Sequence, residues 1–176
     1  METIHFLWIG KTLPEQYAKN ILTFVDFGYK CTLWSYNDFS IKKVKSADAN
    51  KIMPLDNSIQ VLLFADYFRL KLLYKVGGWW SDCDNVCVQE LPETDYYFNT
   101  YRGSTTINNN LMKAPKGCLF LQNCIEKADS LNWKKLSAGT LNFGFFREFT
   151  KGHNLKSYIR RKSIIKNKKP KKRVEY

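Results

Sequence analysis

The order of the elements predicted for the first 36 residues most constrains the fold of this chain. Residues 3–10 are mainly β-branched and aromatic and end in glycine, which is typical of a buried strand. Residues 14–28 begin with proline, carry apolar residues at helical spacing and end in glycine, which predicts a helix. Residues 30–36 then predict a second strand. This order indicates a βαβ unit and therefore a parallel sheet covered by helices.

The remaining chain continues the α/β pattern within one domain. Residues 59–76 are apolar on most sides and precede Gly77 and Gly78, so we expect a long central helix with Ser58 as its N-cap. At 176 residues, 44% of them hydrophobic, the chain can build one domain with a substantial core. Further strands are expected at residues 79–88, 96–98 and 109–114, and a further helix at residues 117–131.

The formal net charge of +12 is concentrated at the C-terminus. Residues 151–176 hold eleven Lys or Arg and one Glu, a balance of +10, whereas the 17 basic and 15 acidic side chains before them nearly cancel. Runs of like charge are usually solvated, and the alternative is contact with the phosphates of lipid or nucleic acid. We therefore expect a folded domain over residues 1–155 and a basic, mobile tail over residues 156–176.

The cysteines and the N-terminus bear on the compartment. Five cysteines without CxxC spacing favour reduced thiols. The N-terminal residues lack the basic and apolar regions of a signal peptide, and no uncharged apolar stretch approaches the length of a membrane span. We expect a cytoplasmic protein, and the basic tail would allow peripheral contact with an anionic membrane surface.

Two aspartates interrupt the apolar strand expected after Gly78. Residues i and i+2 of an extended strand point to the same side, so Asp82 and Asp84 are expected to face one place. Like charges this close repel each other unless a cation lies near them. A sparse set of hard oxygen ligands favours Mg²⁺ or Mn²⁺, whose other positions are filled by phosphates and water. The alternative is a pair of solvated turn aspartates.

A second polar pair lies inside the apolar helix. Asp66 and Arg69 are spaced i, i+3 and share one helix face, where a buried charge must be paired or must meet a polar ligand. The alternative is an internal ion pair that only stabilises the helix. Because the helix ends at Gly77 and the next strand leads to Asp82 and Asp84, we expect both pairs to converge at the C-terminal edge of the sheet, where open α/β sheets bind ligands.

Residues 65–88 combine these features in one segment, ADYFRLKLLYKVGGWWSDCDNVCV. The segment resembles the DxD signature of GT-A glycosyltransferases of the family-32-like group, which includes α-mannosyltransferases, capsular polysaccharide transferases and clostridial glucosylating toxins. Residues 3–10 resemble the opening strand of that family, and the match extends to about residue 130. The resemblance implies an α/β fold of the GT-A type, a Rossmann-like nucleotide-sugar-binding single domain with a mostly parallel central sheet flanked by helices.

The resemblance also implies an activity. A member of this family would be a metal-dependent glycosyltransferase that moves a hexose from a nucleotide sugar, with a UDP-sugar ranked ahead of a GDP-sugar, to a glycan, a lipid-linked acceptor or another hydroxyl, with retention. One alternative is a catalytically impaired, truncated protein that binds sugar nucleotides or glycans. Another is a nucleic-acid binder through the basic tail, which ranks last because the body of the chain does not share the charge of the tail.

Roles for individual residues follow from the same resemblance. Asp84 would bind Mn²⁺ or Mg²⁺ directly, and Asp82 would contact metal-linked water, ribose or the donor sugar. Trp8 would stack near the base, and the alternative for it is a core aromatic on a buried strand. The residues implied to be catalytic are Asp66, Arg69, Asp82 and Asp84; those implied to bind the nucleotide sugar are Trp8, Ile9, Gly10, Asp66, Arg69, Gly77, Gly78 and Asp82; those implied to bind metal are Asp84 and Asp82.

The chain departs from the family after about residue 135, where the Gly-Pro segment common in the family is missing. His153 is a candidate late metal ligand, although a single surface histidine more often has no such role. The three asparagines at 108–110 are candidates for the acceptor side of the site. The missing segment puts in question whether the site closes over a donor.

Overall fold

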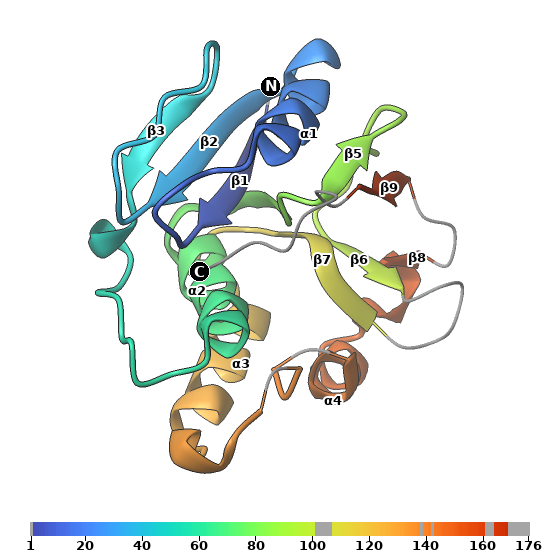
Figure 1. Ribbon diagram of the computed structural model, residues 1–176. Coiled ribbons are helices and arrows are strands. Elements are labelled where there is room, and N and C mark those ends of the chain that lie inside the picture. Colours follow the sequence, from blue (N-terminus) through green and yellow to red (C-terminus); the bar gives the residue numbers. More distant parts are fainter. Residues whose placement is uncertain (1, 101–106, 138, 142, 161–163, 169–176) are drawn as a thin grey trace.

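A seven-stranded sheet runs through the molecule in the order β3-β2-β1-β4-β7-β6-β8 (Figure 1). The computed structural model of the protein describes residues 2–100, 107–137, 139–141, 143–160 and 164–168. Within these residues β7 runs against its neighbours and the other strands of the sheet run in one direction. The strands of this sheet are β1 (Thr3–Trp8), β2 (Lys30–Ser35), β3 (Lys45–Asp48), β4 (Gly78–Ser81), β6 (Tyr97–Thr100), β7 (Ile107–Ala114) and β8 (Ile159–Arg160).

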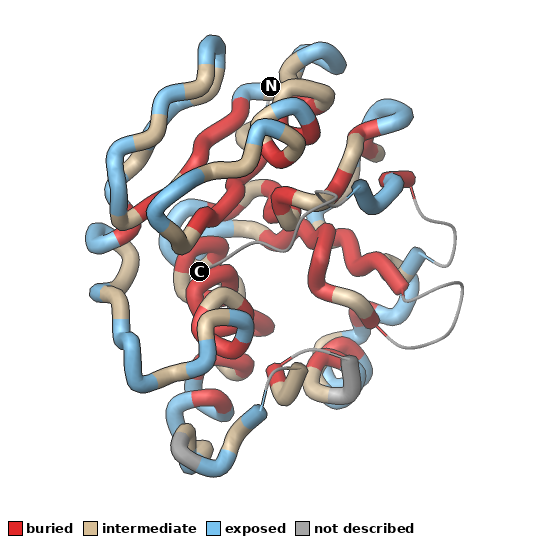
Figure 2. Tube along the Cα trace, in the orientation of Figure 1, coloured by how far each residue is buried: buried red, intermediate tan, exposed pale blue. Residues whose placement is uncertain are grey.

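Helices cover both faces of the sheet, which confirms the expected α/β fold with a mostly parallel sheet. On one face α1 packs with Ile4, Phe6 and Trp79 of the strands; on the other, α2, α3 and α4 pack around Phe68 and Trp80. Figure 2 shows the buried residues gathered in the central strands and along α2. The helices are α1 (Glu15–Asp26), α2 (Val61–Val76), α3 (Leu119–Asp129) and α4 (Phe143–Gly152), with short 3₁₀ helices at Ala49–Lys51, Trp133–Lys135 and Leu155–Tyr158.

The central helix α2 begins later than predicted and ends where predicted. Its N-cap is Gln60, and the expected N-cap Ser58 instead donates its hydroxyl and backbone N–H to Asp56 Oδ1 in the preceding turn, at 2.6 and 2.8 Å. Gly77 ends the helix with φ 71°, and a Cβ there would lie 2.7 Å from the backbone nitrogen of Lys116. The helix stop therefore needs glycine for both its backbone conformation and its close packing.

The single strand predicted over residues 79–88 is wrong. β4 ends at Ser81, a turn follows, and the chain resumes as β5 (Asn85–Cys87), which leaves the main sheet and pairs with β9 (Ile165–Asn167). The two aspartates therefore do not share a side because side chains alternate along one strand, as was predicted. A turn carries both residues.

Part of the region expected to be a basic, mobile tail after residue 155 forms strands in the described part of the chain. Ile159–Arg160 forms β8 beside β6, and Ile165–Asn167 forms β9 beside β5. Ile164 and Ile165 are buried in the cluster under α1. Because two apolar side chains interrupt the run of charge, this part of the chain can join the core. Residues 161–163 and 169–176 lie outside the described residues, and contact of this region with lipid or nucleic acid stays a prediction.

No helix among the described residues combines the length and the apolar character that crossing a membrane requires.

Candidate functional site

The turn between β4 and β5 presents Asp82 and Asp84 at the C-terminal edge of the parallel strands. The backbone N–H of Asp82 donates to the carbonyl of Asn110 on β7 (2.8 Å), and the backbone N–H of Asn85 donates to the carbonyl of Asp82 (3.1 Å). The turn is thus joined to the sheet at its start and closed on itself. Its position after β4 is the place where an open α/β sheet binds ligands.

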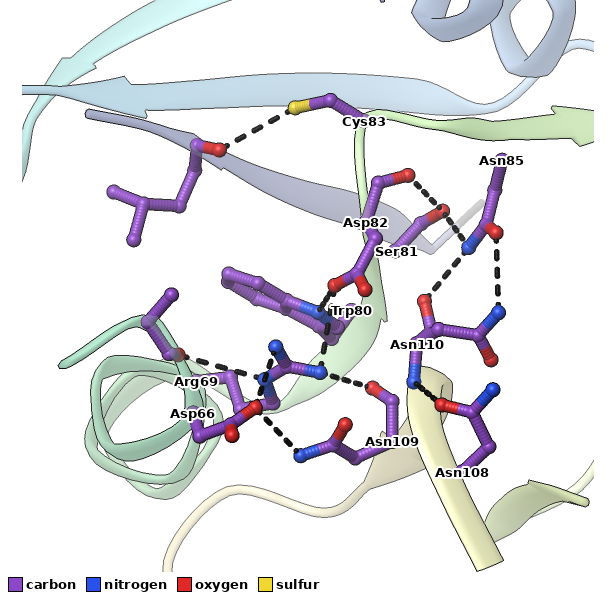
Figure 3. Close-up of polar contacts among 12 residues, drawn as sticks. Asp66, Arg69, Trp80, Ser81, Asp82, Cys83, Asn85, Asn108, Asn109 and Asn110 are labelled. Atoms are coloured by element: carbon purple, nitrogen blue, oxygen red, sulfur yellow. Dashed lines mark hydrogen bonds and ion pairs between the residues drawn. The ribbon is translucent and has the colours of Figure 1, made fainter. Parts of the chain in front are cut away.

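Arg69 on α2 joins Asp66 to Asp82 (Figure 3). Its Nη2 lies 2.9 Å from Asp66 Oδ1, and its Nη1 lies 3.4 Å from Asp82 Oδ1. The guanidinium carbon lies 4.9 Å from the centre of the Trp80 ring, a cation–π contact. The side chains of Asp66 and Arg69 are only 7% and 5% exposed. The predicted convergence of the helix pair with Asp82 is therefore confirmed, and the pair is an internal ion pair as well.

Asp82 holds its proton more tightly than an ordinary aspartate. Burial raises the pKa of Asp82 to about 6; the charges of Asp84 and Asp66 add to the rise, while Arg69 and a hydrogen bond from Trp80 oppose it. Trp80 Nε1 donates to Asp82 Oδ1 at 2.8 Å. A third of the side chain, 34%, is nevertheless exposed. The carboxylate is therefore surrounded by protein but open to a ligand.

Buried asparagines form hydrogen bonds to the side chains and backbone of the site. The sequence did not predict this role for them. Asn109 Nδ2 donates to Asp66 Oδ1 (3.0 Å), and its carbonyl accepts from Arg69 Nη1 (2.5 Å). Asn85 Nδ2 donates to the carbonyl of Asn110 (2.7 Å). Asn109 and Asn110 are buried behind the carboxylates and do not face solvent, contrary to what an acceptor-lining role requires. Consecutive amides in an otherwise apolar strand were the signal for such a network.

A second set of contacts reaches the turn from distant parts of the chain. Asn167 Nδ2 on β9 donates to Asp84 Oδ1 (3.2 Å), and the backbone N–H of Lys168 donates to the carbonyl of Asp84 (2.6 Å). Asn20 Nδ2 on α1 donates to the carbonyl of Lys168 (2.8 Å). The sequence placed Asn167 and Lys168 in a tail and assigned Asn20 no role. Tertiary pairing brings all three to the DxD turn.

Cys83 lies between the two aspartates and points away from them. Its thiol donates to the carbonyl of Leu7 (3.3 Å) and is buried. Burial raises the pKa of Cys83 far above the ordinary thiol value, and the charges of Asp82 and Asp84 add to the rise. A thiol held protonated in this way is neither a metal ligand nor a nucleophile.

Of the residues at the end of β1 that were predicted to bind the nucleotide, Trp8 lies in the core, and Ile9 and Gly10 lie in the loop that follows. Trp8 is 4% exposed, its ring packs 5.2 Å from the ring of Tyr17, and its Nε1 donates to the carbonyl of Thr12 (3.1 Å). The ring therefore lies where a core aromatic lies, covered by the following loop. Ile9 is half-buried against the other core cluster, and the carbonyl of Gly10 accepts from Asn37 Nδ2 (3.0 Å).

Gly77 and Gly78 lie at the opposite edge of the sheet from the DxD turn. They join the end of α2 to the start of β4, whereas Asp82 follows the end of that strand. A Cβ at Gly78, where φ is 89°, would lie 3.0 Å from the carbonyl oxygen of Thr3. Both glycines are thus required by the chain turn. The structure does not bring either of them to Asp82.

A pocket of about 210 Å³ opens at the same edge of the sheet, beyond β2. Polar residues that follow β2 and residues of β3 form its walls. Only β1 separates β2 from β4, so the strand ends that carry the pocket and the DxD turn are about 10 Å apart. The pocket is lined by Leu33, Ser35, Tyr36, Asn37, Asp38, Phe39, Ser46, Ala47 and Asp48.

His153, the candidate late metal ligand, lies on a different part of the molecule. Its Nε2 is 3.0 Å from Asn123 Nδ2, and its ring packs edge-on at 5.8 Å from the ring of Phe120 on α3. These contacts fix it in the helical layer after α4. The structure does not bring it to the DxD turn.

The fit of the turn to a divalent cation rests on two carboxylates. Among the described residues no group of three or more His, Cys, Asp or Glu side chains is arranged to hold a metal ion. Asp82 and Asp84 are nevertheless close enough for the charge of Asp84 to raise the pKa of Asp82, and a cation would relieve this repulsion. Mg²⁺ and Mn²⁺ accept one or two protein carboxylates when phosphates and water supply the other ligands. The residues therefore fit a cation that is held together with a phosphate-bearing ligand.

Comparisons with known proteins agree with this geometry. Residues 15–107 match the family model described as "Glycosyltransferase sugar-binding region containing DXD motif". The solved structure titled "PaToxG Glycosyltransferase" superposes with a TM-score of 0.59 at 17% sequence identity, over 87% of this chain and 68% of that chain. At this identity the likeness concerns the fold. Among curated proteins, no sequence matches the chain.

Proposed function

Because the chain belongs to the family of glycosyltransferase sugar-binding regions that contain a DXD motif, we propose that it transfers a hexose from a nucleotide sugar to a hydroxyl acceptor with the help of a divalent cation. The observation that carries the proposal is the arrangement of Asp82 and Asp84 on one turn beside Arg69. Carboxylates that bind a cation and a nearby guanidinium are the groups that a leaving diphosphate requires. UDP-sugars are the proposed donors, ahead of GDP-sugars.

The proposed division of labour follows the positions of the side chains. Asp84 and Asp82, both half-buried on the turn, would hold Mn²⁺ or Mg²⁺ together with the diphosphate. Such a cation supplies Lewis-acid stabilisation of the charge that develops on the diphosphate. Arg69, 3.4 Å from Asp82, adds a fixed positive charge at the same place. Its contacts to Asp66 and the Asn109 carbonyl keep that charge oriented.

The pocket beyond β2 is the proposed place for the nucleoside. It lies at the sheet edge that carries the DxD turn, and the roughly 10 Å between the two strand ends suits a base and a diphosphate joined by ribose. Asn37 and Asp38 offer amide and carboxylate groups for polar recognition of a base. This assignment replaces Trp8, whose ring is covered, as the proposed base contact.

The test is turnover by the full chain and by Asp84→Ala, with Asp26→Ala as a matched control on an exposed aspartate of α1. Nucleotide release from UDP- and GDP-hexoses is measured with Mn²⁺, with Mg²⁺ and with chelator. We expect turnover of one donor class that needs the metal, is abolished in Asp84→Ala and is unchanged in Asp26→Ala. Turnover by Asp84→Ala at the rate of the unaltered chain would refute the assignment.

A second candidate is a protein that binds a sugar nucleotide without transferring the sugar. The burial of Asp66 and Arg69 in their own ion pair favours it, because a donor sugar would have to displace contacts already made. Calorimetric titration with UDP and GDP, with and without Mn²⁺, distinguishes the two candidates when combined with the turnover assay. Metal-dependent binding without nucleotide release or transfer supports the binding protein.

A further inference from the structure

The last described strand, β9, lies against the DxD turn. β9 pairs antiparallel with β5, and the register places Asn167 opposite Asn85, directly after Asp84. Ile165 on the same strand is buried in the core under α1. The strand is therefore anchored by backbone pairing and by an apolar side chain, and its end lies beside the proposed metal ligand.

Three hydrogen bonds fix Asp84 and its neighbour Asn85 to the end of this strand. Asn167 Nδ2 donates to Asp84 Oδ1 (3.2 Å) and to Asn85 Oδ1 (2.9 Å). The backbone N–H of Lys168 donates to the carbonyl of Asp84 (2.6 Å). One contact orients the carboxylate and another pins the backbone that carries it. The carboxylate position is thereby set by a residue 83 positions away in the sequence.

The buried side chain of Asn20 on α1 hydrogen-bonds to both the DxD turn and the end of β9. Asn20 Nδ2 donates to the carbonyls of Cys83 (3.0 Å) and Lys168 (2.8 Å), and Gln16 Nε2 donates to Asn20 Oδ1 (2.9 Å). Asn20 is 1% exposed, and its hydrogen bond to the Cys83 carbonyl is buried and shielded from water. The turn and the end of β9 therefore form one unit attached to α1.

We propose that Asn167 is a positioning residue that holds Asp84 ready for the cation, so that β9 completes the donor site. The proposal rests on the proposed function. A cation held by only two protein carboxylates gains affinity when those carboxylates are already oriented, because groups that hydrogen-bond metal ligands typically contribute about 10- to 100-fold. Asp82 is oriented by Arg69 and Trp80, and Asn167 supplies the corresponding contact for Asp84.

The test compares Asn167→Ala with Lys166→Ala in the full chain. Lys166 is the exposed neighbour on β9 and pairs with Val86 through its backbone, so its side-chain truncation is a matched control. Mn²⁺ binding in the presence of UDP, and of GDP, is measured by electron paramagnetic resonance and calorimetry. We expect Asn167→Ala to weaken Mn²⁺ binding about 10-fold or more and Lys166→Ala to leave it unchanged. Equal affinity in Asn167→Ala and the unaltered chain overturns the proposal.

A second variant and a second readout separate positioning from general stability. Lys168→Pro removes the N–H that pins the Asp84 carbonyl without changing the Asn167 side chain, and it should weaken Mn²⁺ binding in the same direction. In turnover, Asn167→Ala should need more Mn²⁺ for half-maximal rate and recover its kcat at saturating Mn²⁺. A kcat that stays low at saturating Mn²⁺ with unchanged Mn²⁺ affinity contradicts positioning. If the unaltered chain binds no Mn²⁺ with either nucleotide, the proposed function itself fails.

Discussion

The two edges of the central sheet both bury ionisable side chains, but they use them differently. At the N-terminal edge each charge has one partner of opposite sign. Lys113 Nζ lies 2.5 Å from Glu2 Oε1, and Trp79 Nε1 donates a hydrogen bond to Glu2 Oε2 (2.9 Å). At the C-terminal edge one guanidinium, Arg69, serves the carboxylates of Asp66 and Asp82, and the charge of Asp84 lies close enough to raise the pKa of Asp82.

This difference separates a charge that is balanced within the fold from charges that are not. A buried charge that has one matched partner has much of its desolvation cost offset by that partner and has little affinity left for a ligand. Asp82 shares Arg69 with the buried Asp66, lies near the charge of Asp84 and stays partly exposed, and such a group of carboxylates favours the approach of a further cation. The burial of a charge alone therefore does not identify the site. The surplus of negative charge at the DxD turn and its partial exposure are the features that make this turn the candidate site.

The strongest test of the comparison is Arg69→Met. We expect the free energy of unfolding to fall by about 3–5 kcal/mol, because the change leaves Asp66 buried without its cation. Urea denaturation followed by circular dichroism measures it. The control is Lys19→Met, which breaks an exposed pair with Glu15 on α1 and should change the free energy little. Equal losses in the two variants would mean that Asp66 and Arg69 do not act as a buried pair.

His5, near the N-terminal edge, predicts a pH-dependent stability. Burial lowers the pKa of His5 from 6.5 to about 4; a hydrogen bond with the Gly77 backbone opposes the shift and the charge of Lys45 adds to it. The unfolded chain takes up the proton more readily, so this contribution is complete above pH 6.5 and is lost as the pH falls from 6.5 to 4.

The matching measurement is urea denaturation of the unaltered chain and of His5→Gln at several pH values. Between pH 7 and pH 4, the unaltered chain should lose about 3 kcal/mol more of its free energy of unfolding than His5→Gln does. Taking the difference removes the titration of groups that both chains share. A difference that does not change with pH would show that His5 titrates normally in the folded protein.

Gly77→Ala tests whether this glycine turns the chain or binds the donor. We expect a loss of about 1–3 kcal/mol in the free energy of unfolding, because alanine at φ 71° is strained and its Cβ would lie 2.7 Å from the Lys116 nitrogen. Gly152→Ala is the control, since a Cβ there has no neighbour within 4 Å. Metal–nucleotide binding by the folded Gly77→Ala protein should equal that of the unaltered chain. If Gly77→Ala were as stable as the unaltered chain but did not bind metal and nucleotide, Gly77 would be part of the donor site.

Lys113→Met should have the smallest effect of the four changes. Glu2 is half exposed and keeps its hydrogen bond from Trp79, so the loss of the ion pair should lower the free energy of unfolding by about 1 kcal/mol. Thermal denaturation measures it, and calorimetric titration with Mn²⁺ and UDP should show no change. A loss of nucleotide binding in Lys113→Met would mean that the N-terminal edge takes part in the site.

The sequence was sufficient to predict elements and contacts formed by residues that lie close together in the chain. The βαβ order, the apolar helix, its stop at Gly77 and the proximity of Asp66, Arg69 and Asp82 were all predicted, because helix and strand periodicity act over a few residues and the short connection after Gly77 limits where Asp82 can lie. The N-cap of α2 was misplaced because Ser58 bonds to Asp56 in a turn, which is the competing use of that hydroxyl.

The sequence by itself determined the first βαβ unit, the central helix and the identity of the acidic residues, since these depend on patterns within short windows. Only the tertiary structure decided which groups hold Asp84, because Asn20, Asn167 and Lys168 reach the turn through strand pairing and helix packing across long separations. The basic composition around Ile164 and Ile165 concealed a strand, since two buried side chains outweigh a solvated run of charge once a core is present to receive them. Trp8 likewise could stack on a base or fill the core, and its packing on Tyr17 was decided by the position of α1.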